Sequence, residues 1–176
     1  TFAYLAQILQ NPMAPGGGRF KPQYFIRRVR VAPYESKRIR YWDRAATQDG
    51  GCFTAGVLMA LDSDGKYYVE HVEKGQWEPD ERNARIVAVA LADRVRYGPK
   101  HIPLIVIEAE RGSTGFESFQ NLARKLAGFR IKEDVPSGSK DVRAEPWADQ
   151  LAAGNVYLVE NGTWDINGYI QEHLSF

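Results

Sequence analysis

Two acidic residues stand where the sequence pattern predicts little contact with water. Asp43 lies in the segment 38–46, whose alternation is typical of a strand and places Asp43 on one face with Ile39. Glu108 ends the segment 103–108, a continuous apolar run. A carboxylate in such a position is costly unless it is paired or binds a metal ion.

Two interpretations of these acids stay open. In open α/β sheets ligands bind at the carboxyl ends of strands, which is where Glu108 falls, and the strand of Asp43 could be its neighbour. The two carboxylates could share divalent cations, since Mg²⁺ and Mn²⁺ prefer oxygen ligands, and two such ions ~4 Å apart hydrolyse phosphodiesters. Alternatively each acid is neutralised locally, Asp43 by Arg40, Arg44 or turn amides, and Glu108 by Arg111 or backbone amides.

A basic segment rich in aromatic residues is the second chemical feature. Residues 19–44 contain nine Lys or Arg and two acids, a net charge of +7, whereas the whole chain carries 23 basic and 22 acidic residues. Such a segment suits contact with nucleic-acid phosphates. It equally suits a solvated linker and a charged edge strand. The net charge of +1 for the whole chain does not by itself indicate nucleic-acid binding.

Composition limits the class of protein. With 176 residues, 44% of them apolar, the chain is expected to form one packed domain. A single cysteine, Cys52, excludes an internal disulfide and a cysteine-rich zinc site. The histidines are scattered, and His71 and His173 receive no role. No apolar run approaches the ~20 residues of a membrane span, and the first residues do not resemble a signal peptide.

The elements that must position these residues follow the order βββαβαβαβα. Strands are predicted at 38–46, 52–61, 66–75, 103–108, 129–131 and 155–159, and helices at 79–97, 113–126, 140–153 and 165–174. A further strand is possible within 24–31. The first three strands, joined by tight turns, form an antiparallel meander, and the apolar run 103–108 is typical of a central parallel strand. We expect an α/β fold with a mixed sheet and helices on both faces.

Sequence blocks then point to a family. The blocks are Ala6-Gln7-Ile8-Leu9-Gln10-Asn11-Pro12; Tyr41-Trp42-Asp43-Arg44-Ala45-Ala46-Thr47 with Gly50-Gly51; Val106-Ile107-Glu108 with Gly112-Ser113-Thr114-Gly115; and Lys140-Asp141-Val142-Arg143-Ala144 with Pro146-Trp147-Ala148 and Ala153-Gly154-Asn155-Val156. Together and in this order they resemble the nuclease domain of phage terminase large subunits. The first block resembles the connector that leaves the ATPase domain of that family.

The resemblance implies a ribonuclease-H-like fold and an endodeoxyribonuclease that cuts concatemeric double-stranded DNA when packaging begins and ends. It implies Mg²⁺ or Mn²⁺ as cofactor, with two ions. Asp43 matches the first-strand metal ligand of the family and Glu108 the second acid, in preference to Glu110. The third acid of the family is expected beyond Phe176. Asp165 is not a replacement, because it opens a predicted helix and suits an N-cap.

Basic residues are candidates for contact with DNA. Lys140 and Arg143 lie one turn apart at a predicted helix start, where the resemblance favours phosphate contact over an ordinary exposed terminus. Arg40 and Arg44 are further candidates from the basic segment.

The resemblance also places the chain in a larger machine. Residues 1–23 are expected to connect to an N-terminal ATPase domain, and 24–176 to form the nuclease domain without its C-terminal end. No phosphate-loop motif occurs, so the chain is not expected to hydrolyse ATP. The implied partners are the terminase small subunit and the capsid portal, in the host cytoplasm and transiently at the procapsid. An oligomer is expected in the motor and a monomer for this chain alone.

Two alternatives belong to other classes. The chain could be a non-catalytic module that docks the motor onto DNA or the portal, its acids serving structure. It could instead be another ribonuclease-H-like nuclease such as a resolvase, although the Lys140 block and the N-terminal connector argue against this.

Overall fold

The computed structural model describes residues 18–44, 53–109 and 113–176. Its strands are β1 (Arg28–Val29), β2 (Lys37–Asp43), β3 (Thr54–Leu61), β4 (Tyr67–Gly75), β5 (Leu104–Glu108), β6 (Ile131–Asp134) and β7 (Val156–Val159). Its helices are the 3-10 turn η1 (Pro22–Phe25), α2 (Pro79–His101), α3 (Ser113–Lys125), α4 (Lys140–Ala152) and α5 (Ile166–Leu174). The predicted connector, the turn at 48–51 and Cys52 lie partly or wholly outside the described residues.

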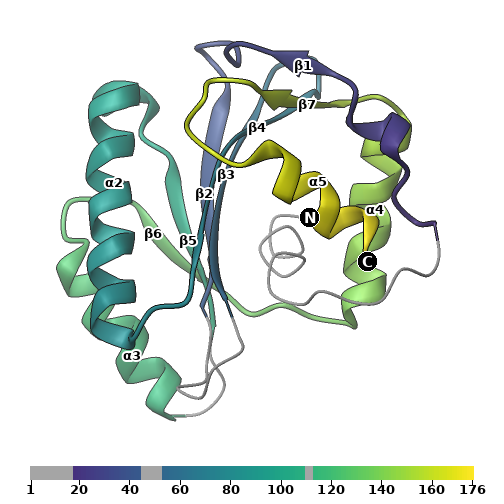
Figure 1. The fold of residues 1–176 in the computed structure, drawn as a ribbon. Coiled ribbons are helices and arrows are strands. Elements are labelled where there is room, and N and C mark those ends of the chain that lie inside the picture. The colour runs from purple at the N-terminus through teal and green to yellow at the C-terminus, as the bar shows by residue number, and fades with distance from the viewer. Residues whose placement is uncertain (1–17, 45–52, 110–112) are drawn as a thin grey trace.

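The strands form one mixed sheet in the order β1-β7-β4-β3-β2-β5-β6 (Figure 1). β2, β3 and β4 pair antiparallel, which confirms the predicted meander. β5 lies between β2 and β6 and is parallel to both, as its continuous apolar run predicts.

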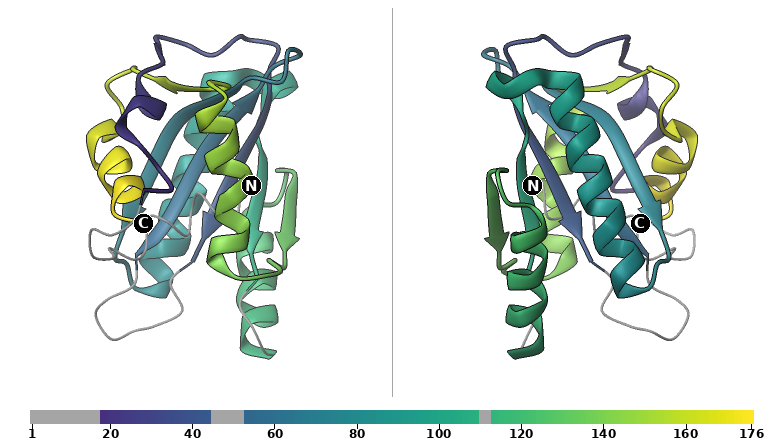
Figure 2. Two further views of the ribbon diagram at one scale, coloured as in Figure 1. Left: turned by 90° about the vertical axis from the view of Figure 1, so that its right-hand side faces the viewer. Right: turned by 90° about the vertical axis from the view of Figure 1, so that its left-hand side faces the viewer.

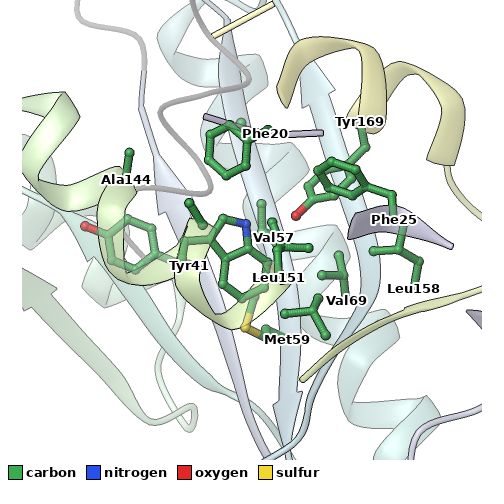
Figure 3. Packing of buried hydrophobic residues seen from close by; sticks show 14 of the residues in the cluster. Phe20, Phe25, Tyr41, Val57, Met59, Val69, Ala144, Leu151, Leu158 and Tyr169 are labelled. Atoms are coloured by element: carbon green, nitrogen blue, oxygen red, sulfur yellow. The ribbon is translucent and has the colours of Figure 1, made fainter. Parts of the chain in front are cut away.

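Helices cover both faces of the sheet. Figure 2 shows α4 and α5 in front of the sheet in one view and α2 and α3 in front of it in the other. Successive side chains of β2 point to opposite faces, so this strand contributes to the core on each side of the sheet. Tyr41 joins the cluster beneath α4 and α5, whereas Trp42 joins the cluster beneath α2 and α3. Figure 3 shows the first cluster, in which Met59 of β3 and Leu151 of α4 pack together with Tyr41.

Two predicted boundaries are wrong and one holds. The strand expected within 24–31 is reduced to the two residues of β1, because the 3-10 turn η1 occupies 22–25. α2 reaches His101 only across a break at Gly98, whose left-handed φ of 67° is not helical, so the regular helix ends at Tyr97 as predicted. β6 lies at 131–134 instead of 129–131, since Phe129 belongs to the turn after α3, where its N–H donates to the carbonyl oxygen of Leu126.

Among the described helices, none combines the length and apolar character needed to cross a membrane.

Candidate active site

Three carboxylates lie in one row at the carboxyl ends of neighbouring strands. Trp42 of β2 is in register with Ile107 of β5, so the next residues, Asp43 and Glu108, are neighbours on the same face. Glu108 is in register with Asp134, the last residue of β6. The structure thus brings together the two predicted acids, and we refer to Asp43, Glu108 and Asp134 as the acidic row.

Tyr41 connects two members of the acidic row. Its hydroxyl lies 3.2 Å from Glu108 Oε2 and 3.0 Å from Asp134 Oδ2, and its one proton can be donated to either carboxylate. The pKa of Tyr41 is raised far above its ordinary value, mainly by burial and to a smaller extent by the negative charges of Glu108 and Asp134. Tyr41 therefore stays a phenol, and its single proton serves one of the two carboxylates at a time.

Asp134 was missed by the sequence analysis. An acid at the carboxyl end of a strand next to β5 is the same signal that selected Glu108, but the predicted strand ended three residues too early. The charged residues Lys132 and Glu133 give β6 no apolar strand pattern, although charge is common on edge strands.

Asp43 ends β2 and Arg44 follows it, both at buried positions. The exposed fraction of Asp43 is 6%, in agreement with the prediction that its face is covered. Arg44 Nη1 donates to Ser118 Oγ of α3 at 2.9 Å, so its side chain reaches the helix layer on the other side of the sheet. The position of Arg44 is next to the acidic row, whereas its guanidinium is buried beside α3.

Arg40 corrects a prediction, since it is not at the acidic row. It is buried, and its Nε and Nη2 donate to the two carboxylate oxygens of Asp93 in α2 at 2.9 and 2.8 Å. Its Nη1 lies 3.0 Å from His71 Nδ1. With its guanidinium held by these partners, Arg40 neither neutralises Asp43 nor is available to a DNA phosphate.

The two histidines without an assigned role have partners after all. The pKa of His71 is lowered to about 4, mainly by burial and to a smaller extent by the positive charge of Arg40. Burial lowers the pKa of His173 to about 4 as well. Trp147 Nε1 donates to His173 Nε2 at 3.3 Å, and His173 Nδ1 lies 2.8 Å from the carbonyl oxygen of Tyr169. This pattern fits a neutral imidazole with its proton on Nδ1.

Lys140 and Arg143 begin α4, as predicted. Ser139 caps the helix, with its Oγ accepting from Val142 N at 3.3 Å. Only the five residues 135–139 separate Lys140 from the end of β6, which places the start of α4 near the acidic row (Figure 1). Lys140 is exposed and Arg143 is half-buried.

A lysine completes the row on its other side. Asp43 is in register with Ala55 of β3, and Ala55 with Lys74 of β4, so Lys74 lies on the same face two strands from Asp43. Lys74 Nζ pairs with Glu172 of α5 and lies 4.4 Å from the ring centre of Phe53. The sequence carried no signal for Lys74, since its position depends on the register of two strand pairs.

The carboxylate oxygens of the acidic row are the kind of ligand that a hard divalent cation prefers. Across residues 18–44, 53–109 and 113–176, no three Asp, Glu, His or Cys side chains are arranged to hold a metal ion by themselves. Asp43 and Glu108 would therefore supply two protein ligands, and water or substrate phosphates would complete the shell, as is usual for Mg²⁺.

Comparison with known proteins gives no sequence match. No protein-family model matches the chain, and a search of curated proteins finds no match either.

Solved structures do resemble this fold. The human cytomegalovirus terminase nuclease domain, soaked with manganese and bound to an inhibitor, has a TM-score of 0.61 at 11% identity and covers 89% of this chain and 83% of its own. The large terminase nuclease of thermophilic phage G20c with bound magnesium gives 0.49 at 14% identity, covering 93% and 76%. T. thermophilus RuvC in complex with a Holliday junction substrate gives 0.43 at 15% identity, covering 78% and 89%.

The fold class follows from the first of these structures. The chain has a ribonuclease-H-like fold, a mixed sheet with helices on both faces, as predicted. More particularly, it has the fold of a viral terminase nuclease domain, which the sequence blocks had indicated.

Proposed function

We propose that this chain is the metal-dependent nuclease domain of a viral genome-packaging motor, an endodeoxyribonuclease acting on double-stranded DNA. The observation that carries the proposal is the acidic row, in which Asp43 and Glu108 are adjacent at the carboxyl ends of two parallel strands. A carboxylate buried as Asp43 is, within a row of carboxylates, is costly unless it is paired or binds a metal ion. The terminase-like fold and the sequence blocks supply the motor context.

The cofactor we propose is Mg²⁺ or Mn²⁺, held as two ions by Asp43 and Glu108. The cytomegalovirus domain was soaked with manganese, which agrees with this choice. Bound divalent cations would activate a water molecule and neutralise charge on the leaving oxygen. The third acid of the family stays a prediction beyond Phe176.

The residues around the row have distinct tasks in this proposal. Tyr41 holds Glu108 and keeps it oriented. Lys140 and Arg143 are the proposed contacts to DNA phosphates, and Lys74 joins them because it lies in line with Asp43. Arg44 is not among them, because its guanidinium is buried against α3. Since phosphate contacts carry no base information, cleavage is expected to tolerate many sequences.

The motor context adds proposals about the whole assembly. Residues 1–23 would connect to an ATPase domain, and 24–176 would be the nuclease domain. The terminase small subunit and the capsid portal would be partners, in the host cytoplasm and at the procapsid, with the motor oligomeric and this chain alone monomeric.

The test is cleavage of supercoiled plasmid by the purified chain with Mn²⁺, Mg²⁺ or EDTA. We expect nicked and linear products only with the metals. Salt-sensitive DNA binding without cleavage would favour the docking module. Strong preference for a four-way junction over linear duplex would favour a resolvase.

A further inference from the structure

A basic pocket lies at the end of the sheet opposite the acidic row. Its volume is about 400 Å³, and it is bounded by the start of β2, the last turn of α2 and the residues before β5 and β6. In Figure 1 this is the upper end of the sheet, where α2 ends and β5 begins. β2 spans seven residues, so at ~3.3 Å per residue Lys37 lies roughly 20 Å from Asp43.

The lining of this pocket, which we call the basic pocket, includes Lys37, Lys100 and Arg130. Lys37 and Lys100 are exposed, and neither forms an ion pair with any other described residue. Arg130 Nη2 donates to the carbonyl oxygen of Ile102 at 2.8 Å. This bond holds the guanidinium at the wall of the pocket and leaves its other N–H groups for a ligand.

The acids near the basic pocket do not balance these cations. Glu35, the carboxylate in its lining, has a highly exposed side chain and lies 3.9 Å from His101 Nε2. Arg38 also lines the pocket, but its Nε donates to Glu70 Oε2 at 2.8 Å within the core, so this arginine is already paired. An excess of positive charge therefore faces the pocket.

A buried hydroxyl gives an independent indication. Ser36 lines the basic pocket with only 4% of its surface exposed, yet its Oγ has no hydrogen-bond partner in the described part of the chain. Burial of a polar group without a partner is unfavourable, and such groups in folded proteins usually meet a ligand or an ordered water.

We propose that the basic pocket binds a phosphate group. Lys37, Lys100 and Arg130 would supply the charge, and the Ser36 hydroxyl would donate a hydrogen bond to a phosphate oxygen. The phosphate could belong to a DNA backbone or to a free phosphate. A simpler account of Lys100, that it balances the dipole at the end of α2, explains neither Lys37 nor the unpaired Ser36 Oγ. The proposal goes beyond the nuclease function and does not depend on it.

The test compares two double variants that remove equal charge. K37A/K100A removes two cations of the basic pocket, whereas K21A/K125A removes two exposed lysines elsewhere. Inorganic phosphate is titrated by NMR, with amide shifts of residues 36–37 and 100–101 as readout, and a labelled 20-base-pair duplex by fluorescence anisotropy in EDTA. S36A tests the hydroxyl, and thermal melting checks that each variant is folded.

We expect K37A/K100A to weaken phosphate binding at least tenfold, S36A to weaken it severalfold, and K21A/K125A to leave it unchanged. If the duplex loses affinity with K37A/K100A, and the slope of log K against log salt falls by about 2, the phosphate is that of the DNA backbone. If only inorganic phosphate loses affinity, the ligand is a free phosphate. The proposal would be overturned if the two double variants weakened phosphate binding equally. It would also be overturned if phosphate caused no amide shifts at residues 36–37 and 100–101 of the wild type.

Discussion

At the scale of residues, the acids of the candidate site are organised by a tyrosine. The sequence left arginine neutralisation open, and the structure gives Arg40 to Asp93 instead. Glu108 and Asp134 accept from Tyr41. A neutral donor orients carboxylates without itself bringing a positive charge to them.

Removing this hydroxyl tests its role. Tyr41→Phe should cost about 1 kcal/mol of stability and lower metal-dependent cleavage about 10 to 100-fold, the range typical for residues that orient metal ligands. The measurements are thermal melting and plasmid cleavage. The matched control is Tyr68→Phe, which removes a hydroxyl that donates to Asp62 Oδ2 at 2.8 Å far from the row. Equal cleavage by the two variants would contradict the orienting role.

The buried histidine predicts a pH dependence of stability. Because the pKa of His173 falls from 6.5 to about 4 on folding, the unfolded chain binds more protons between these values. Stability should be fully present above pH 6.5 and should fall by about 3 kcal/mol as the pH drops to 4. His71 acts with the same sign in the same window.

Urea unfolding from pH 7 to 4 measures this effect. His173→Gln should be less stable throughout, because Trp147 and the Tyr169 carbonyl lose a well-placed partner, but its stability should depend less steeply on pH. His101→Gln, at a half-buried histidine in the last turn of α2, is the control. An unchanged slope in His173→Gln would show that the imidazole does not resist protonation.

At the scale of elements, β2 connects the site to both cores. Its alternate residues enter opposite clusters, and its Trp42 ring lies against Gly56 of β3. A Cβ at Gly56 would stand 2.6 Å from the ring, closer than atoms can approach. Trp42 is 1% exposed and cannot move aside easily.

Gly56→Ala should therefore destabilise the fold by about 1 to 3 kcal/mol, through overpacking. Denaturant unfolding measures the loss. Val95→Ala, at a side chain that is 87% exposed, is the neutral control. A Gly56→Ala variant as stable as the wild type would mean that β3 and Trp42 are not packed as described.

The buried ion pair between β2 and α2 makes a second prediction at this scale. Asp93→Ala leaves the Arg40 guanidinium buried without its carboxylate and should cost about 3 to 5 kcal/mol. The double variant R40M/D93L, with apolar groups of similar volume, should recover most of that loss. Denaturant unfolding separates these outcomes, and unchanged DNA affinity in the double variant would agree with a purely structural Arg40.

At the scale of the whole molecule, local patterns predicted the centre of the sheet and failed at its edges. The apolar run of β5 and the turns between β2, β3 and β4 determine the pairing that brings Asp43 beside Glu108. The charged edge strand β6 has no such pattern, so Asp134 was not predicted as a residue of the site. The partner of Arg40 lies 53 residues away in α2, and spacing along the chain cannot indicate it.

The basic segment shows the same limit. Its net charge of +7 suited either DNA contact or a solvated surface, but several of its arginines form ion pairs within the fold. Arg38 pairs with Glu70 and Arg40 with Asp93 in the core, and Arg28 pairs with Glu160 near the surface. The local excess of charge is therefore partly balanced by acids from distant elements.

The central claim is that the acidic row cleaves DNA with divalent metal, and Asp43→Asn tests it most directly. Asparagine keeps the size of the side chain but removes the negative charge that a cation requires. Plasmid cleavage in Mn²⁺ is compared for the wild type, Asp43→Asn and Asp64→Asn, an exposed acid at the other end of the sheet, with melting curves to confirm folding. The account predicts that the wild type and Asp64→Asn cut whereas Asp43→Asn does not. Equal cutting by folded Asp43→Asn would contradict it.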